Sequence, residues 1–129
     1  MTNIRAMLVA VLTALLLSAC GGMGPVGDYL NSSNKQLASG IKSYEDGDYQ
    51  VAAITIRRAQ EAGLEDKRDQ VIAYKYMAFI HCVSGREKQC REEFKNALEI
   101  DPTFELSSSE AGHPVWGPVF RSVRAKAVR

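Results

Sequence analysis

Apolar positions recur with the period of an α-helix from about residue 31 onward. Leu37, Ile41 and Tyr44 follow one another at i, i+4 and i+7, which places them on one face of a first helix. We expect residues 31–33 (Asn-Ser-Ser) to cap its start. A second stretch has the same period up to Gly63, with Tyr49, Ala52, Ile56 and Ala59 on one face. The pattern therefore predicts two amphipathic helices joined by a turn at residues 46–48.

The next two stretches differ in how much of their surface is apolar. Residues 69–83 are apolar almost all round, with Lys75 as the main exception, which is typical of a helix buried on several sides. Residues 87–100 are amphipathic, and Asp101-Pro102 ends them because the residue before a proline disfavours helix. We expect the first of these two helices to be central.

A last helix is predicted after Pro114, where proline suits a first turn. Apolar side chains then recur at i, i+3, i+4 and i+7, namely Trp116, Val119, Phe120 and Val123. We expect Trp116 and Phe120 to pack against the helix that carries Cys90 and Leu98, and residues 103–111 to be a surface loop with Phe104 and Leu106 turned inward. The whole of residues 31–129 is thus predicted to be one all-α domain.

The first four helices contain a repeat. Gly47 and Gly85 stand in equivalent turns, and each is followed at the same spacing by a small residue, a large apolar residue and an alanine: Ala52, Ile56, Ala59 and Cys90, Phe94, Ala97. This pattern resembles the tetratricopeptide repeat, with units at about 33–66 and 71–104, the first without a closing proline. The resemblance implies two helical hairpins and a C-terminal capping helix, since an end repeat needs cover.

The same resemblance implies a concave binding face formed by the first helix of each unit. Its residues would be Asn34, Leu37, Ile41, Tyr44, Ile72, Lys75 and Phe79. The sequence leaves open whether Leu37, Ile41, Ile72 and Phe79 line a groove or belong to the core.

The N-terminal 19 residues read as an export signal. Arg5 precedes the uncharged, apolar residues 6–19, a run shorter than the roughly 20 residues that span a membrane. The run ends in Leu17-Ser18-Ala19-Cys20, which resembles the bacterial lipobox. That resemblance implies cleavage before Cys20, acylation of Cys20 and a lipid anchor, with the glycine-rich residues 20–30 as a flexible tether. The alternative is a chance cysteine within an ordinary signal peptide.

Lipoprotein sorting, again by resemblance, favours the outer membrane with the domain facing the periplasm, because Gly21 stands where an aspartate would signal retention in the inner membrane. The lipobox, the tether, the repeats and the segment Phe104–Val123 together resemble the TssQ-type lipoproteins associated with type VI secretion. The implied function is a non-catalytic protein–protein interaction module in a cell-envelope secretion complex. The alternatives are a pilotin-like or other envelope-assembly adaptor and a structural envelope lipoprotein.

Cys82 and Cys90 lie one turn before and one turn after the Ser84-Gly85 bend. In an oxidising compartment such a pair favours a disulfide, and the alternative is two buried thiols. His81 and His113 could join the two cysteines in a metal site, but the spacing matches no common zinc pattern, so we expect no metal.

Charge and motifs argue against several function classes. The chain has 16 basic and 15 acidic side chains, so no basic excess points to nucleic acid. The sequence contains no Gly-x-Ser-x-Gly motif, and no histidine is paired with an obvious nucleophile and carboxylate. We therefore expect no catalysis, no small-molecule substrate and no cofactor besides the lipid on Cys20.

Overall fold

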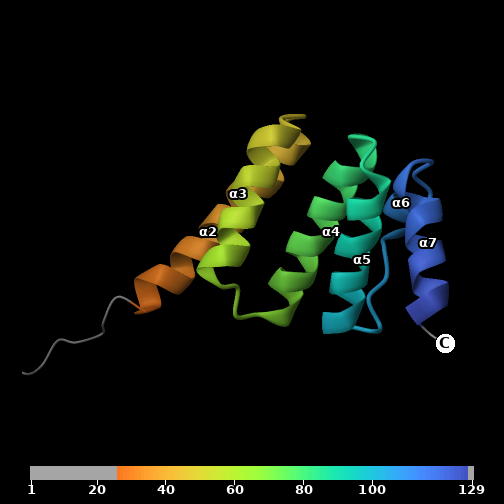
Figure 1. Ribbon diagram of the computed structural model, residues 1–129. Coiled ribbons are helices and arrows are strands. Elements are labelled where there is room, and N and C mark those ends of the chain that lie inside the picture. Colours follow the sequence, from red (N-terminus) through yellow and green to blue (C-terminus); the bar gives the residue numbers. More distant parts are fainter. Residues whose placement is uncertain (1–25, 128–129) are drawn as a thin grey trace, which may run out of the picture.

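The structure is a computed structural model that describes the backbone of residues 26–127 and the side chains of residues 32–127. The predicted signal segment 1–19, the predicted lipidation site Cys20 and residues 21–25 of the predicted tether lie outside this range. In the described range, helices are the only regular elements (Figure 1). The all-α prediction is confirmed. None of these helices combines the length and the apolar character that crossing a membrane requires.

The helices form two antiparallel hairpins followed by a C-terminal segment. The first hairpin is α2 (Val26–Glu45) with α3 (Tyr49–Ala62), and the second is α4 (Lys67–Val83) with α5 (Glu87–Ile100). The short α6 (Ser108–Ala111) and α7 (Trp116–Ala127) follow, and α7 packs on α5 and α4 (Figure 1). This arrangement agrees with the predicted order of two hairpins and a capping helix.

Glycines make both hairpin turns and one close helix contact. Gly47 and Gly85 have φ angles of 83° and 73°, a conformation that favours glycine over other residues. Gly40 lets α2 approach α3, because a Cβ there would lie 2.6 Å from Cγ1 of Ile56 and 3.0 Å from its backbone nitrogen. The equivalent turn glycines in the sequence thus mark equivalent turns in the fold.

The first helix starts earlier than its sequence pattern indicated. α2 begins at Val26, so residues 31–33 lie inside it, and residues 26–30 of the predicted tether are helical. Ser33 is only 1% exposed, which makes it a small residue packed within the domain rather than a cap. The predicted cap was wrong because small polar residues are tolerated inside a helix that tertiary packing stabilises.

Two groups of buried side chains form the core, and α4 contributes to both. One group joins α4, α5 and the C-terminal segment: Ala78, Phe79, Cys82, Cys90, Phe94, Leu98, Leu106, Trp116, Val119 and Phe120. The other joins the first hairpin to α4: Leu37, Ala52, Ile56, Ala59, Leu64, Ala73, Met77 and Ile80. The helix that is apolar nearly all round is therefore the central one, as predicted.

The C-terminal segment differs from the prediction in two details. Residues 108–111 form α6 instead of loop, held by a capping box between Ser107 and Glu110. Phe120 packs edge-on against Phe94 of α5 as expected, but Trp116 stacks on Phe79 of α4, with ring centroids 4.3 Å apart. Trp116 thus covers a ring of α4 that Phe94 of α5 contacts as well.

Candidate functional site

The predicted binding face lies on what we call the inner face, the side of the molecule formed by α2, α4 and the α6–α7 segment. Leu37 and Phe79, two of its seven predicted residues, are only 4% and 2% exposed and belong to the core. They do not reach a partner. The choice between groove and core that the sequence left open is therefore decided for these two residues.

The other predicted residues retain surface on the inner face. Asn34 is exposed, whereas Ile41, Tyr44 and Ile72 are half-buried and pack against the core of the first hairpin. Each of these three half-buried side chains thus packs against the core on one side and is exposed to solvent on the other. The surface they offer is shallow.

Lys75 is the charged centre of the inner face. Its Nζ lies 2.7 Å from Oε1 of Glu110, and both side chains are largely shielded from water. Burial alone would raise the pKa of Glu110, but the hydrogen bond from Lys75, the Ser107 backbone N–H and the charge of Lys75 outweigh it and lower that pKa. Glu110 is thus held as a carboxylate that ties α6 to α4.

A row of aromatic rings runs from α2 across α4 to the C-terminal segment. Tyr44 contacts Tyr76 with ring centroids 5.1 Å apart, and Tyr76 contacts Phe79 with centroids 5.8 Å apart. The Phe79 ring in turn stacks on Trp116. Burial, reinforced by nearby tyrosines and Glu110, raises the pKa of Tyr44 to about 12, and burial also raises the pKa of Tyr76. The Lys75 ammonium lies 4.9 Å from the Tyr76 ring centroid, a cation–π distance.

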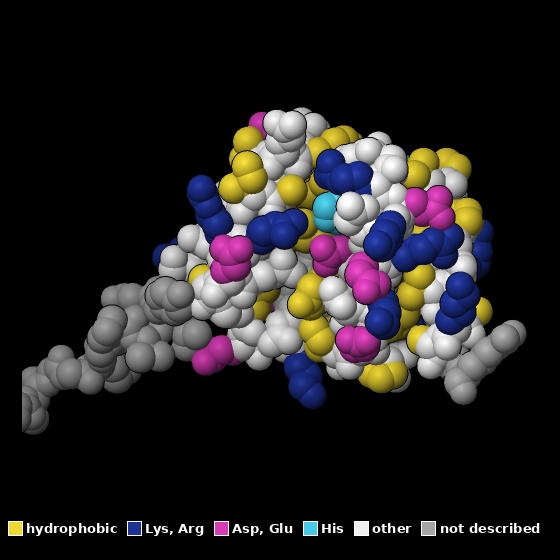
Figure 2. Space-filling model, viewed as in Figure 1, with side chains coloured by type: hydrophobic (Ala, Val, Ile, Leu, Met, Phe, Trp, Pro, Cys, Tyr) yellow, Lys and Arg dark blue, Asp and Glu magenta, His cyan; other side chains and the backbone are white. Residues whose placement is uncertain are grey.

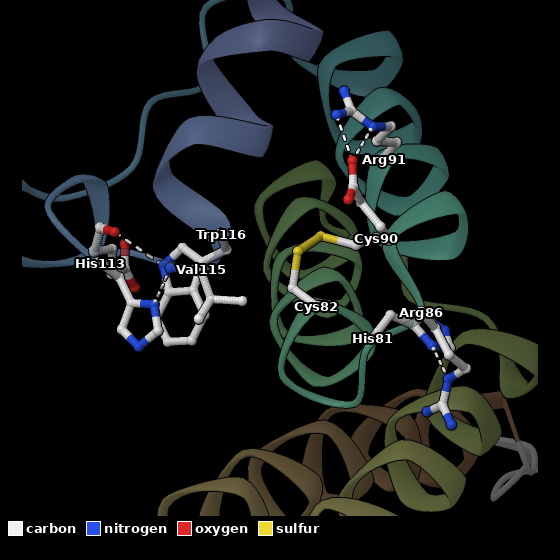
Figure 3. Close-up of a disulfide and its surroundings, with 10 residues drawn as sticks. His81, Cys82, Arg86, Cys90, Arg91, His113, Val115 and Trp116 are labelled. Atoms are coloured by element: carbon white, nitrogen blue, oxygen red, sulfur yellow. Dashed lines mark hydrogen bonds and ion pairs between the residues drawn. A yellow bond between two sulfur atoms is a disulfide. The ribbon is translucent and has the colours of Figure 1, made fainter.

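Trp116, at the end of this row, is held by a hydrogen bond and a ring-stacking contact. Its indole Nε1–H donates to the Glu110 backbone carbonyl at 2.9 Å, so its polar atom is satisfied. The His113 ring stacks on the indole with centroids 3.3 Å apart, and its Nδ1 accepts a hydrogen bond from the Val115 backbone N–H (Figure 3). The inner face is consequently rigid at its C-terminal end.

A disulfide joins Cys82, near the end of α4, to Cys90, in the first turn of α5, with Cα atoms 5.1 Å apart (Figure 3). Both sulfur atoms are therefore engaged with each other and are not metal ligands. Among the described residues, no group of three or more histidine, cysteine, aspartate or glutamate side chains gathers to hold a metal ion.

His81 and Glu93 form a second polar cluster, away from the inner face. Arg86 Nε donates to His81 Nδ1 at 3.0 Å, and His81 Nε2 lies 3.7 Å from Glu93 Oε1. Burial, then the charges of Arg86 and Arg57, lowers the pKa of His81, while burial raises the pKa of Glu93. At pH 7 the imidazole is neutral, so its contact with Glu93 is not an ion pair.

Sequence reasoning missed three residues that shape the inner face: Tyr76, Glu110 and Trp116. A signal existed for Glu110, because Ser107-x-x-Glu110 is the capping-box pattern. The sequence carried no signal that Trp116 would choose Phe79 as its partner, since the two residues are distant in the chain.

Comparison with known proteins adds no relative. No family model, no curated protein and no solved structure matches the chain.

Proposed function

We propose that the protein is a membrane-anchored lipoprotein that acts as a non-catalytic protein–protein interaction module of the cell envelope. Its inner face would bind a protein partner in a secretion complex, and the lipid on Cys20 would hold it at the outer membrane, facing the periplasm. The segment Phe104–Val123, by its resemblance to TssQ-type lipoproteins, points to the type VI secretion apparatus as that complex.

The observation that carries the proposal is a rigid inner face built on helical hairpins. Lys75 is fixed by Glu110, and Tyr44 and Tyr76 are held by neighbouring rings, yet each of these side chains keeps some surface. Side chains that are already ordered lose little entropy on binding, which favours recognition of a protein surface. A pair of hairpins that resembles tetratricopeptide units supports the same use.

Two observations support the location. The lipobox-like Leu17-Ser18-Ala19-Cys20 precedes the domain, and the domain contains a disulfide, which persists in oxidising compartments such as the bacterial periplasm. Two or more acyl chains on Cys20 would give stable anchoring, whereas one would give only marginal binding.

The location is tested with the Cys20→Ser variant, expressed in a Gram-negative host that is fed radiolabelled palmitate. The parent chain should incorporate label and fractionate with outer membranes, and the variant should do neither because the acceptor thiol is gone. Label in the variant equal to that in the parent would contradict a lipid anchor at Cys20.

The partner is tested by placing a photo-crosslinking amino acid at Asn34, which is exposed on the inner face, in cells that carry a type VI secretion system. The matched control places the same group at Lys95, which is exposed on α5. A secretion component crosslinked from position 34 and not from position 95 is the expected result. Equal recovery from both positions, or from neither, would contradict binding through the inner face.

A further inference from the structure

The helix α3 exposes more apolar surface than a solvent-facing helix needs. In the described range four large hydrophobic side chains are exposed, and α3 carries three of them: Tyr49 at 40%, Val51 at 47% and Ile54 at 53%. Tyr49 and Ile54 border one cavity of about 600 Å³, which is also lined by Gln50, Ala53, Ile80, Ser84 and Arg86. Exposed apolar side chains beside a cavity are typical of an interaction site.

This cavity belongs to a groove between the two hairpins. Among the described residues, α3 and α5 do not contact each other, although both pack on α4. The groove therefore has α3 as one wall, α4 as its floor and the start of α5 as its far end. We call it the inter-hairpin groove, and it opens away from the inner face, on the side of the molecule seen in Figure 2.

Two arginines bring positive charge to the groove: Arg86 lines the cavity, and Arg57 stands on α3 one turn beyond the lining residue Ala53. The Nε of Arg86 bonds to His81, which leaves its two terminal amino groups without a partner in the described part of the chain. Arg57 on α3 is exposed and makes no ion pair with any described residue. Figure 2 shows Lys and Arg side chains on two sides of a histidine on this face, with Asp and Glu side chains below it.

The charges of Arg86 and Arg57 converge on one place. Both contribute to lowering the pKa of His81, after burial itself, so both guanidinium groups lie close enough to act on the same imidazole. The acidic group at this place, Glu93, is largely shielded from water and is attracted by Arg57, so one carboxylate faces two guanidinium groups. The groove thus combines apolar walls with two guanidinium groups and only one neighbouring carboxylate, that of Glu93.

We propose that the inter-hairpin groove binds an acidic amphipathic segment of a partner protein. Aliphatic or aromatic side chains of that segment would cover Ile54 and Tyr49, and its carboxylates would pair with Arg57 and Arg86. A segment without carboxylates would cover the terminal amino groups of Arg86 and leave them unpaired, which is costly. The groove is distinct from the inner face, so this proposal adds a second contact to the proposed function.

The groove is tested by crosslinking with a matched pair of positions on α3. The same photo-crosslinking amino acid replaces Ile54, which borders the cavity, or Val51, which is equally exposed but does not line it. The full chain is expressed in its membrane-anchored form, and crosslinked peptides are sequenced by mass spectrometry. We expect position 54 to capture a partner segment that places aspartate or glutamate beside apolar residues, and position 51 not to capture it.

The charge requirement is tested by reversing one arginine at a time. Arg57→Glu should lower the yield of the position-54 crosslink by about tenfold, because an attraction becomes a repulsion. Arg58→Glu, the neighbouring exposed residue, should leave it unchanged, and circular dichroism should give both variants the helicity of the parent.

Three outcomes would overturn the proposal: equal yields from positions 54 and 51, a captured segment that is basic or comes from a second copy of this chain, or equal effects of the two charge reversals. The position-34 crosslink on the inner face should persist in Arg57→Glu. If the position-34 crosslink does not form even when Arg57 and Arg58 are intact, that result counts against the proposed function instead. The two failures are therefore distinguishable.

Discussion

Three residues of the second hairpin, Cys82, Cys90 and Glu93, show how the surroundings set side-chain chemistry. Cys90 is fully buried and Cys82 nearly so, and they are bonded to each other across the bend. Glu93, one turn further along α5, is largely shielded from water beside a neutral histidine. The same residue types on an exposed helix would be an ordinary thiol pair and an ordinary carboxylate.

Reducing the disulfide should destabilise the domain by about 2–3 kcal/mol, because the bond closes a short loop and restricts the unfolded chain. The Cys82→Ser, Cys90→Ser double variant should lose at least this amount, because it also places two hydroxyl groups at buried positions. Urea unfolding of the parent with and without dithiothreitol measures the difference. A parent whose stability does not respond to dithiothreitol would contradict a stabilising disulfide.

Glu93→Gln should stabilise the protein at neutral and alkaline pH. The folded-state pKa of Glu93 is raised by burial, so the native chain holds its proton to a higher pH than the unfolded chain. The carboxyl therefore costs stability as the pH rises through the folded-state pKa, and costs nothing where it is protonated in both states.

Thermal melts at about pH 4 and pH 8 test this sign. The variant should melt above the parent at the higher pH, and the gap should close at the lower one. Glu92→Gln, an exposed neighbour with the same charge change, is the control. An equal gap at both pH values would show that packing, not ionisation, causes the effect.

At the scale of elements, the helices of a pair pack together where small residues let their backbones approach closely. α2 and α3 approach at Gly40, and α6 and α7 approach at Gly117, where a Cβ would lie 2.4 Å from the Ala111 carbonyl oxygen. Small residues at such points let two helices bury their apolar faces against each other. Ala52, a small residue of the repeat pattern, lies at the first of these contacts, since a Cβ at Gly40 would be 3.4 Å from its carbonyl oxygen.

Gly40→Ala should destabilise the domain by about 1–3 kcal/mol, since the new methyl group would push Ile56 and its backbone away from α2. Gly112→Ala is the matched control, because its Cβ would find only ordinary contacts, at 3.6 Å and beyond, and its φ of −79° suits any residue. Urea denaturation measures both variants. Equal stability of the two would show that the helices can separate without cost.

At the scale of the whole molecule, α4 connects the two buried groups of side chains. Its residues Ala73, Met77 and Ile80 pack toward the first hairpin, while Phe79 and Cys82 pack toward α5 and α7. If α4 separated from one of these groups, its apolar side chains in the other group would be exposed as well. The two hairpins should therefore unfold together.

The chain offers a direct measure of this coupling, because its one tryptophan, Trp116, lies in the C-terminal group, whereas circular dichroism reports all helices. Urea unfolding curves from tryptophan fluorescence and from circular dichroism should coincide, as a two-state transition requires. A fluorescence transition at a different urea concentration would show that the second hairpin unfolds on its own.

Much of the fold was accessible from the sequence because hydrophobic periodicity and turn residues act locally. The bounds of α5 and the end of α3 at Gly63 follow from such signals, and so does the central place of α4. The start of α2 was not accessible in this way, because local capping preferences at residues 31–33 compete with packing against the rest of the domain. The four-residue α6 depends on a single capping box, which is a weak signal in isolation.

The residues of the inner face were likewise only partly predictable from the sequence. Lys75, Tyr44 and Ile72, which the sequence placed on this face, retain surface in the structure, whereas Leu37 and Phe79, which it placed on the same face, are buried in the core. Periodicity tells which side chains share a helix face, and burial depends on what the neighbouring helix places opposite them.

By itself, the sequence determined the helical class, the order of the hairpins, the turn glycines and the lipobox-like motif, since each is written in a short run of residues. Only the tertiary structure decided that Trp116 covers Phe79, that Glu110 reaches Lys75 and that Arg57 and Arg86 both act on His81. Those pairs are far apart in the chain. Their meeting depends on the angles at which whole helices pack, which no local pattern encodes.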